Sequence, residues 1–237
     1  MCARITLTTT KTEIADLFGL SNDLGVEGRR RFNVAPSRPV PVVRAAGGRR
    51  ELVEMRWGLV PHWARGPKLS GYANARAETA PEKPAFRDPF RFRRCVVPAD
   101  GFFEWKQVGR RKQPYFFRRA GGGVVAFAAL WDAWSGPDGP VETVAVLTVP
   151  ANDLVEPMHD RMPAILSEGD IAAWLDPRET DPRNLLPLLL SFPTERMERW
   201  PVSDRVNAVG TDDPDLLLPV PEPAKPAWVQ PSLFDVA

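Results

Sequence analysis

Short runs of alternating or wholly apolar residues, separated by Gly and Pro, recur along the chain and are typical of β-strands. The first run alternates strictly: Ala3, Ile5 and Leu7 share one face, and Cys2 and Arg4 lie on the polar face. The same patterns predict strands at residues 2–8, 39–44, 52–59, 94–97, 101–106, 114–118, 124–131, 141–148 and 164–166.

Helical periodicity is rarer. It predicts a helix at 12–18 that Gly19 ends, a helix at 167–175 with Ser167 as its cap, and a helix at 185–190. The polar stretch at 74–79 fits neither a strand nor a surface helix well.

Many short strands and few helices predict an α+β fold, and 26 prolines argue against an all-helical protein. We expect a single β-rich domain with a curved, barrel-like sheet and a few peripheral helices. No linker or repeat interrupts residues 1–211, which we assign to one catalytic domain. Residues 212–237 are rich in Pro and acidic side chains and are predicted to form a disordered tail.

The composition excludes several classes of protein. A hydrophobic content of 43% is sufficient for a sizeable core, but no apolar run is long enough for a membrane span or a signal peptide. We therefore expect a cytoplasmic protein. Its two cysteines, Cys2 and Cys95, form neither a disulfide framework nor a metal site, and Cys95 falls in an apolar strand. No metal and no cofactor are predicted.

Charge is distributed unevenly along the chain. Residues 1–166 carry 25 basic and 17 acidic side chains, whereas residues 167–237 carry 6 basic and 13 acidic ones. The positive field of the larger segment suits a polyanion such as nucleic acid, and a nucleoid-associated protein would have such a field.

The candidate nucleophile is Cys2. Removal of Met1 would give this residue both an α-amine and a thiol, and such an aminothiol condenses with an aldehyde to an imine and then closes a thiazolidine ring. Two further residues stand out. Glu104 lies in an aromatic strand between Phe103 and Trp105, and His159 is one of only two histidines.

Six ordered blocks resemble the SRAP family, whose members carry the label "SOS response-associated peptidase". They are Met1-Cys2-Ala3-Arg4, Asn33-Val34-Ala35-Pro36, Arg56-Trp57-Gly58-Leu59-Val60-Pro61, Asn74-Ala75-Arg76-Ala77-Glu78-Thr79, Pro98-Ala99-Asp100-Gly101-Phe102-Phe103-Glu104-Trp105 and His159-Asp160-Arg161-Met162-Pro163. The resemblance implies covalent capture of abasic sites in single-stranded DNA by the N-terminal cysteine. Ala3 stands where the family usually has Gly.

The resemblance also implies the site residues. The catalytic set is Cys2, Asn74, Glu104 and His159: Glu104 would open the sugar ring by general acid/base catalysis, His159 would shuttle protons, and Asn74 would hold the sugar or the amine. Arg4, Arg76 and Arg161 would bind phosphates and Trp63 and Trp105 would stack on bases, with Pro39 completing the DNA-binding set.

Two other functions remain open. One is a cysteine peptidase, or an autopeptidase that removes Met1, using Cys2. The other is a non-covalent single-strand binder in which Cys2 is incidental.

A partner other than DNA is suggested by the C-terminal pentapeptide. Gln230, Leu233 and Phe234 match the motif by which bacterial repair proteins dock on the sliding clamp, although these residues could equally pack back on the domain. We expect a monomer.

Overall fold

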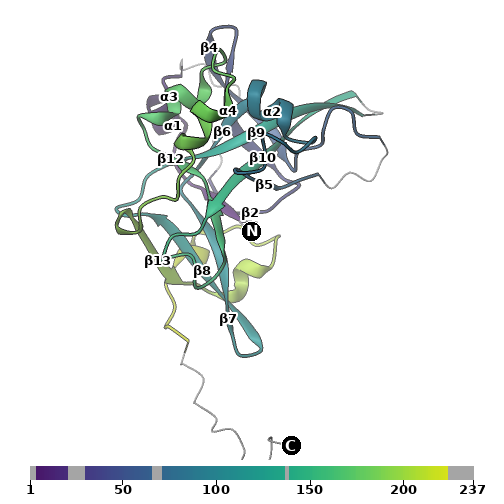
Figure 1. The fold of residues 1–237 in the computed structure, drawn as a ribbon. Coiled ribbons are helices and arrows are strands. Elements are labelled where there is room, and N and C mark those ends of the chain that lie inside the picture. The colour runs from purple at the N-terminus through teal and green to yellow at the C-terminus, as the bar shows by residue number, and fades with distance from the viewer. Residues whose placement is uncertain (1–3, 21–29, 66–70, 137–138, 224–237) are drawn as a thin grey trace, which may run out of the picture.

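The computed structural model describes residues 4–20, 30–65, 71–136 and 139–223 (Figure 1). Its centre is a closed barrel in which each strand pairs with the next, in the order β10-β4-β3-β6-β9 and back to β10. The barrel strands are β3 (Pro39–Ala46), β4 (Arg49–Trp57), β6 (Arg94–Ala99), β9 (Val125–Gly136) and β10 (Gly139–Pro150).

A second sheet packs beside the barrel, with strand order β13-β8-β7-β1-β2 (Figure 1). Its strands are β1 (Ile5–Leu7), β2 (Arg31–Val34), β7 (Gly101–Val108), β8 (Arg111–Arg119) and β13 (Met197–Pro201). Only Asp100 separates β6 from β7, so the chain passes directly from the barrel into this sheet.

Short strands and helices complete the fold. β5 (Asn74–Arg76) and β11 (Arg161–Pro163) pair with β10, and β12 (Ile165–Leu166) pairs with β9. The α-helices are α1 (Lys11–Phe18), α2 (Arg87–Phe92), α3 (Asp170–Leu175) and α4 (Pro182–Leu185); the 3₁₀ turns are η1 (Leu186–Leu188), η2 (Thr194–Arg196), η3 (Asp204–Asn207) and η4 (Pro214–Leu217). The expected α+β fold with a barrel-like sheet and few helices is confirmed.

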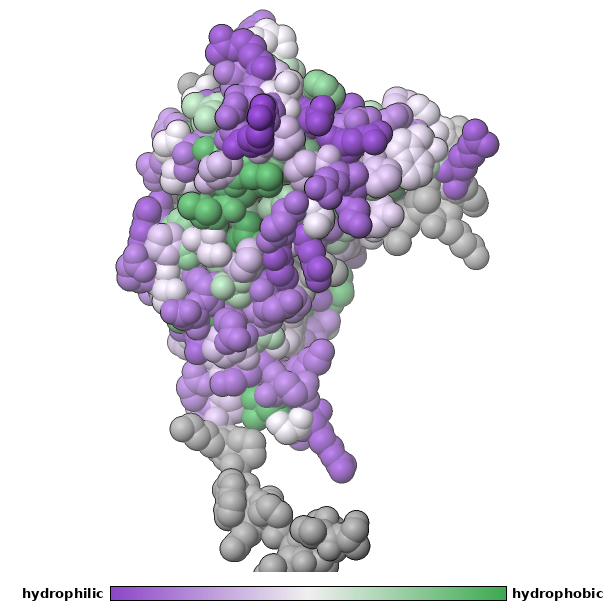
Figure 2. All heavy atoms as spheres, viewed as in Figure 1, coloured by the Kyte–Doolittle hydropathy of each residue, from purple (hydrophilic) through white to green (hydrophobic). Residues whose placement is uncertain are grey.

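Among the described residues, buried apolar side chains form two clusters. The larger one fills the barrel and includes Cys95, which is fully buried and whose pKa is raised by that burial, as expected of an inert core thiol. The smaller one lies under the second sheet and consists of Phe103, Phe116, Val202, Val206 and Leu216. The face seen in Figure 2 is mainly hydrophilic, with a hydrophobic area near α3 and α4. None of the helices in the described part of the chain has the length and apolar character needed to span a bilayer.

Several local predictions need correction. Residues 74–76 form a strand, because they take their hydrogen bonds from β10 and need no propensity of their own. The helix expected at 185–190 is replaced by α4 and the 3₁₀ turn η1, where Pro187 has no N–H to continue an α-helix. The helix expected from 167 begins at Asp170, whose backbone N–H donates to Ser167 Oγ at 3.3 Å.

The polar face of the first strand is not exposed. Arg4 and Thr6 are both buried, because β1 is an inner strand between β7 and β2 and because the C-terminal segment covers this face.

The boundary expected between 211 and 212 lies too early. Leu216 in η4 is fully buried in the smaller cluster, and Asp212 accepts hydrogen bonds from the backbone of Phe32 and Asn33 on β2. Glu222 accepts a hydrogen bond of 2.6 Å from the hydroxyl of Tyr115. The chain is therefore packed against the domain at least as far as Glu222, while residues 224–237 lie outside the described residues.

Candidate functional site

Glu104 is a buried carboxyl group on β7. Its side chain is 4% exposed, lies next to the fully buried Phe103, and is opposite Tyr115 on β8. Burial raises the pKa of Glu104 to about 7; the negative charge of Asp160 adds to this effect, and the backbone N–H of Trp105 opposes it. A carboxyl group of this kind exchanges protons close to neutral pH, as general acid/base catalysis requires.

His159 lies in the loop between β10 and β11, next to Asp160. Its Nδ1 atom is 2.9 Å from the backbone nitrogen of Arg161 and 2.9 Å from Oδ1 of Asp160. Burial lowers the pKa of His159, which favours the neutral ring. The negative charge of Asp160 in this loop also acts on Glu104 of β7, where it raises the pKa.

Strand β10 gathers another part of the predicted site. β5 runs parallel to it, with Asn74 opposite Val146 and Arg76 opposite Thr148. Asn74 is half-buried and Arg76 is exposed. β11 pairs with the same end of β10: Pro163 is opposite Thr148, as Arg76 is, and Arg161 is opposite Pro150, two residues further along β10.

Two of the three predicted phosphate-binding arginines are buried and bound to other parts of the protein. Arg4 is 9% exposed, donates to Asn33 Oδ1 at 2.7 Å and to the Val206 carbonyl, and lies over the Trp105 ring. Arg161 is 8% exposed and forms hydrogen bonds of 2.7 and 2.8 Å with the carboxylate of Glu78. Of the three, only Arg76 presents an exposed side chain.

The predicted stacking residues also differ in exposure. The Trp63 side chain is 54% exposed, whereas Trp105 is half-buried and donates from Nε1 to Asn207 at 2.8 Å. Pro39 is exposed at the start of β3.

The neighbour of Trp63, His62, is held by a buried carboxylate. Its backbone nitrogen and its Nδ1 atom are both 3.0 Å from Oδ2 of Asp132, which is 3% exposed.

Cys2 lies outside the described residues, and Arg4 is the first residue on its C-terminal side that the structure describes. The carbonyl of Arg4 accepts a hydrogen bond of 3.0 Å from the backbone N–H of Phe103, the residue before Glu104. The chain therefore enters the second sheet beside Glu104.

The sequence-based analysis missed three polar residues that hold this site: Asn33, Glu78 and Asp160. Asn33 accepts from Arg4, Glu78 binds Arg161, and Asp160 acts on Glu104 and His159. Each lies within one of the six sequence blocks that resemble the SRAP family. Membership of these blocks was the signal by which the sequence could have identified them.

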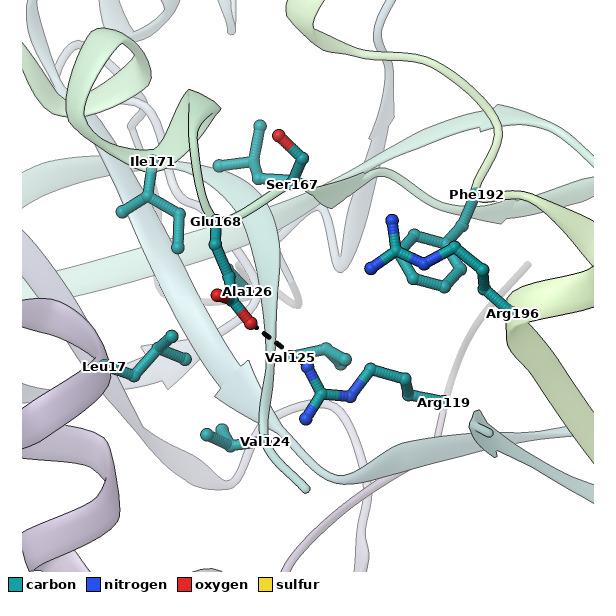
Figure 3. Close-up of a pocket in the computed structure, with 11 residues that line it drawn as sticks. Leu17, Arg119, Val124, Val125, Ala126, Ser167, Glu168, Ile171, Phe192 and Arg196 are labelled. Carbon is teal, nitrogen blue, oxygen red and sulfur yellow. Dashed lines mark hydrogen bonds and ion pairs between the residues drawn. The ribbon is translucent and has the colours of Figure 1, made fainter. Parts of the chain in front are cut away.

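A pocket between α1, β9 and α3 is separate from these residues (Figure 3). Its two arginines face protein groups: Arg119 is 3.2 Å from Glu168, and Arg196 lies over the ring of Phe192. The pocket contains none of the predicted site residues, and we assign no function to it. In the described ranges, no cluster of three or more His, Cys, Asp or Glu side chains is arranged to hold a metal ion.

Comparisons with known proteins identify the family of the chain. Residues 1–209 match the family described as SOS response associated peptidase (SRAP). The chain is 39% identical to the abasic site processing protein YoqW of Bacillus subtilis, over 92% of this chain and 99% of that protein. It is 36% identical to the abasic site processing protein HMCES of Gallus gallus, over 82% of this chain and 68% of that protein.

Among solved structures, a crystal structure of a Bacteroides thetaiotaomicron protein has a TM-score of 0.81 and 26% identity, over 92% of this chain and all of that one. With this fold, the match over residues 1–209 and relatives of this identity, the chain belongs to the SRAP family.

Proposed function

We propose that the protein captures abasic sites in single-stranded DNA covalently, through Cys2 after removal of Met1. The observation that carries the proposal is the buried Glu104, whose pKa of about 7 suits proton transfer at neutral pH. The names of the relatives, which describe abasic site processing, support the same substrate.

Covalent geometry limits where Cys2 can react. Two residues of extended chain span at most ~7 Å, so the Cα atom of Cys2 stays within that distance of the Cα atom of Arg4. Since the carbonyl of Arg4 accepts a hydrogen bond from the backbone N–H of Phe103, this limit would keep the Cys2 nucleophile near Glu104.

The chemistry follows from the aminothiol. Glu104 transfers a proton that opens the cyclic hemiacetal of the abasic sugar to its aldehyde. The amine of Cys2 adds to the aldehyde carbon, and loss of one water gives the imine. The thiolate then adds to the same carbon and the nitrogen takes up a proton, so the product is a thiazolidine and one water is released in total.

The remaining site residues would position the DNA. Arg76, exposed beside Asn74, would bind a flanking phosphate, and Trp63 would stack on a neighbouring base. Asn74 would hold the sugar or the Cys2 amine. Arg4, Arg161, Trp105 and Pro39 would shape the strand-binding surface around them.

Intact-mass analysis tests the proposal. Mixing the protein with an oligonucleotide that carries one abasic site should give an adduct equal to protein without Met1 plus DNA minus one water. A matched protein with an uncleaved N-terminal tag should give none. Equal crosslinking by the tagged protein would exclude the thiazolidine mechanism.

The family description favours a second candidate, a peptidase that uses Cys2, of which self-removal of Met1 is the simplest form. Cys2→Ser separates the two functions that need the Cys2 thiol, covalent capture and peptide hydrolysis, from non-covalent binding. The serine protein keeps an amine but loses the thiol, so it should bind single strands without forming a stable adduct. If abasic and undamaged strands bind the parent equally and reversibly, the protein is a non-covalent binder.

We also propose that the tail docks on the sliding clamp, which would bring a cytoplasmic, nucleoid-associated protein to stalled replication forks. Gln230, Leu233 and Phe234 carry this proposal and lie outside the described residues. A tail peptide should bind the clamp at roughly micromolar concentration, as a short segment that orders on binding does. Replacing Leu233 and Phe234 by Ala should abolish this binding and leave crosslinking unchanged; no binding of the unaltered peptide at high micromolar concentration would contradict the idea.

A further inference from the structure

The two histidines are held in opposite ways at Nδ1. In His159 this atom is 2.9 Å from the backbone nitrogen of Arg161, which can only donate. In His62 it is 3.0 Å from a carboxylate oxygen of Asp132, which accepts. A neutral imidazole carries one ring proton, so His159 carries it on Nε2 and His62 carries it on Nδ1.

The residue that fixes the His159 ring is itself anchored. Arg161 donates from Nη1 and Nη2 to the two carboxylate oxygens of Glu78, at 2.7 and 2.8 Å, and from Nη2 to the carbonyl of Thr148 on β10. The same carbonyl accepts the backbone N–H of Ala77 at 2.9 Å. The guanidinium group of Arg161 on β11 therefore binds both Glu78, which follows β5, and the backbone of β10.

The pair is charge-assisted. Partial burial is the largest single effect and opposes ionisation of Glu78, but the hydrogen bonds and charge of Arg161, a backbone hydrogen bond and the charge of Arg76 together outweigh it and lower the pKa of Glu78. The Arg161 side chain is 10% exposed, so loss of the Glu78 carboxylate would leave a buried guanidinium without its main acceptor.

We propose that Glu78 is a positioning residue: by clamping Arg161 it holds the Arg161 N–H against Nδ1 of His159, which then presents Nε2–H as a hydrogen-bond donor. This inference rests on the proposed function, in which the acceptor is the sugar oxygen that becomes the aldehyde. Glu104 is then left to accept and return the proton. The carboxylate of Asp160 also lies 2.9 Å from this Nδ1; it can accept from that atom only when Nδ1 carries a proton, in the Nδ1–H tautomer or in the protonated ring, and either form would break the hydrogen bond from the Arg161 N–H.

Nuclear magnetic resonance of the full chain labelled with ¹⁵N-histidine tests the inference without DNA. With only two histidines, His62→Asn assigns both signals. Above neutral pH the parent should show His159 protonated at Nε2 and His62 at Nδ1. In Glu78→Gln the His159 signal should move to a mixture of tautomers, and that of His62 should not change.

The same variant should also react more slowly. The crosslinking rate at saturating abasic DNA should fall about 10–100-fold, as is common when a group that orients a reacting side chain is lost. Affinity for the undamaged strand should not fall. Glu198→Gln is the matched control, because it removes the carboxylate that lies 2.6 Å from Arg118 on β8, and it should change neither measurement.

Two results would overturn the inference: a parent His159 protonated at Nδ1, or an unchanged His159 tautomer and rate in Glu78→Gln. Should the Gln variant fail to fold, Glu78→Asp provides the same test, because its side chain is one methylene shorter and so lengthens both contacts with the guanidinium group. If the parent protein never crosslinks, the proposed function is wrong, but the tautomers of His159 and His62 can still be measured. Failure of the proposed function can therefore be distinguished from failure of this inference.

Discussion

At the scale of single residues, two glutamates of this domain show how surroundings set proton affinity. Glu104 is buried in an aromatic strand and its pKa is raised from an ordinary value of 4.5 to about 7. Glu78 is half exposed and paired with Arg161, and its pKa is lowered. The first glutamate is thereby suited to proton transfer and the second to holding an arginine.

We expect Glu104→Gln to slow crosslinking by about 10²–10⁴-fold, the usual contribution of a general acid/base. The substitution keeps the shape of the side chain and removes only proton transfer, so affinity for undamaged single strands should be nearly unchanged. Rates at saturating DNA, measured by denaturing gel, would show this. A variant as fast as the parent would remove Glu104 from the catalytic set.

Glu104 should also destabilise the folded protein at pH values above 4.5, the ordinary pKa of a glutamate. Between pH 4.5 and about 7 the folded protein holds a proton that the unfolded chain has lost, so the free energy of unfolding falls as pH rises. The full cost is on the order of 3 kcal/mol, at about 1.4 kcal/mol per pH unit. Glu104→Gln should therefore be more stable than the parent at pH 8 and no more stable at pH 4.5, as measured by urea unfolding; a gain that is the same at both pH values would contradict the assignment.

At the scale of elements, the junction of β6 and β7 positions the site. Asp100 accepts hydrogen bonds from the backbone and hydroxyl groups of Thr8 and Thr9 and so holds the end of β1. The next residue, Gly101, pairs with Thr6 and packs closely on β8. The strand that follows Cys2 is thus fixed to the strand that carries Glu104.

Gly101→Ala should disrupt this junction. A Cβ atom at this position would lie 2.3 Å from the carbonyl oxygen of Phe117 and 2.6 Å from the ring of Phe116. We expect a loss of about 1–3 kcal/mol in the free energy of unfolding, as for other overpacked sites. Gly210→Ala is the control, since a Cβ there meets nothing within 4 Å. Equal melting temperatures for the two variants would show that β8 can move away from the added Cβ atom on β7 without loss of stability, and would contradict the prediction.

At the scale of the whole molecule, the segment after β13 closes the second sheet. Val206 and Leu216 complete the smaller apolar cluster, and the carbonyl of Val206 accepts from Arg4. Residues near both ends of the described chain therefore meet beside Glu104.

Truncation tests the role of this segment. A chain ending at residue 211 loses Leu216 and should be destabilised by about 2–5 kcal/mol, the range for deleting a large buried apolar side chain. A chain ending at residue 223 keeps every contact described here and should melt like the full protein. If both shortened chains melt alike, the segment from 212 to 223 adds nothing to the fold.

The sequence alone determined the features that depend on residues close together in the chain, namely where helices end and where strands lie. The α1 helix was predicted to end at Gly19, and it does so in the left-handed conformation that glycine adopts most readily. Short apolar runs bounded by turn residues located the barrel strands and the buried strand around Glu104, because both signals depend only on residues that are close together in the chain.

The tertiary structure alone decided which polar groups meet. The contact of Arg4 with Val206 spans 202 positions, and that of Arg161 with Glu78 spans 83. No local pattern encodes such pairs, because the partners are brought together by the packing of sheets and not by the spacing of residues. The same holds for β5 and for residues 212–223, which have little propensity of their own and are ordered by the strands and the apolar cluster against which they pack.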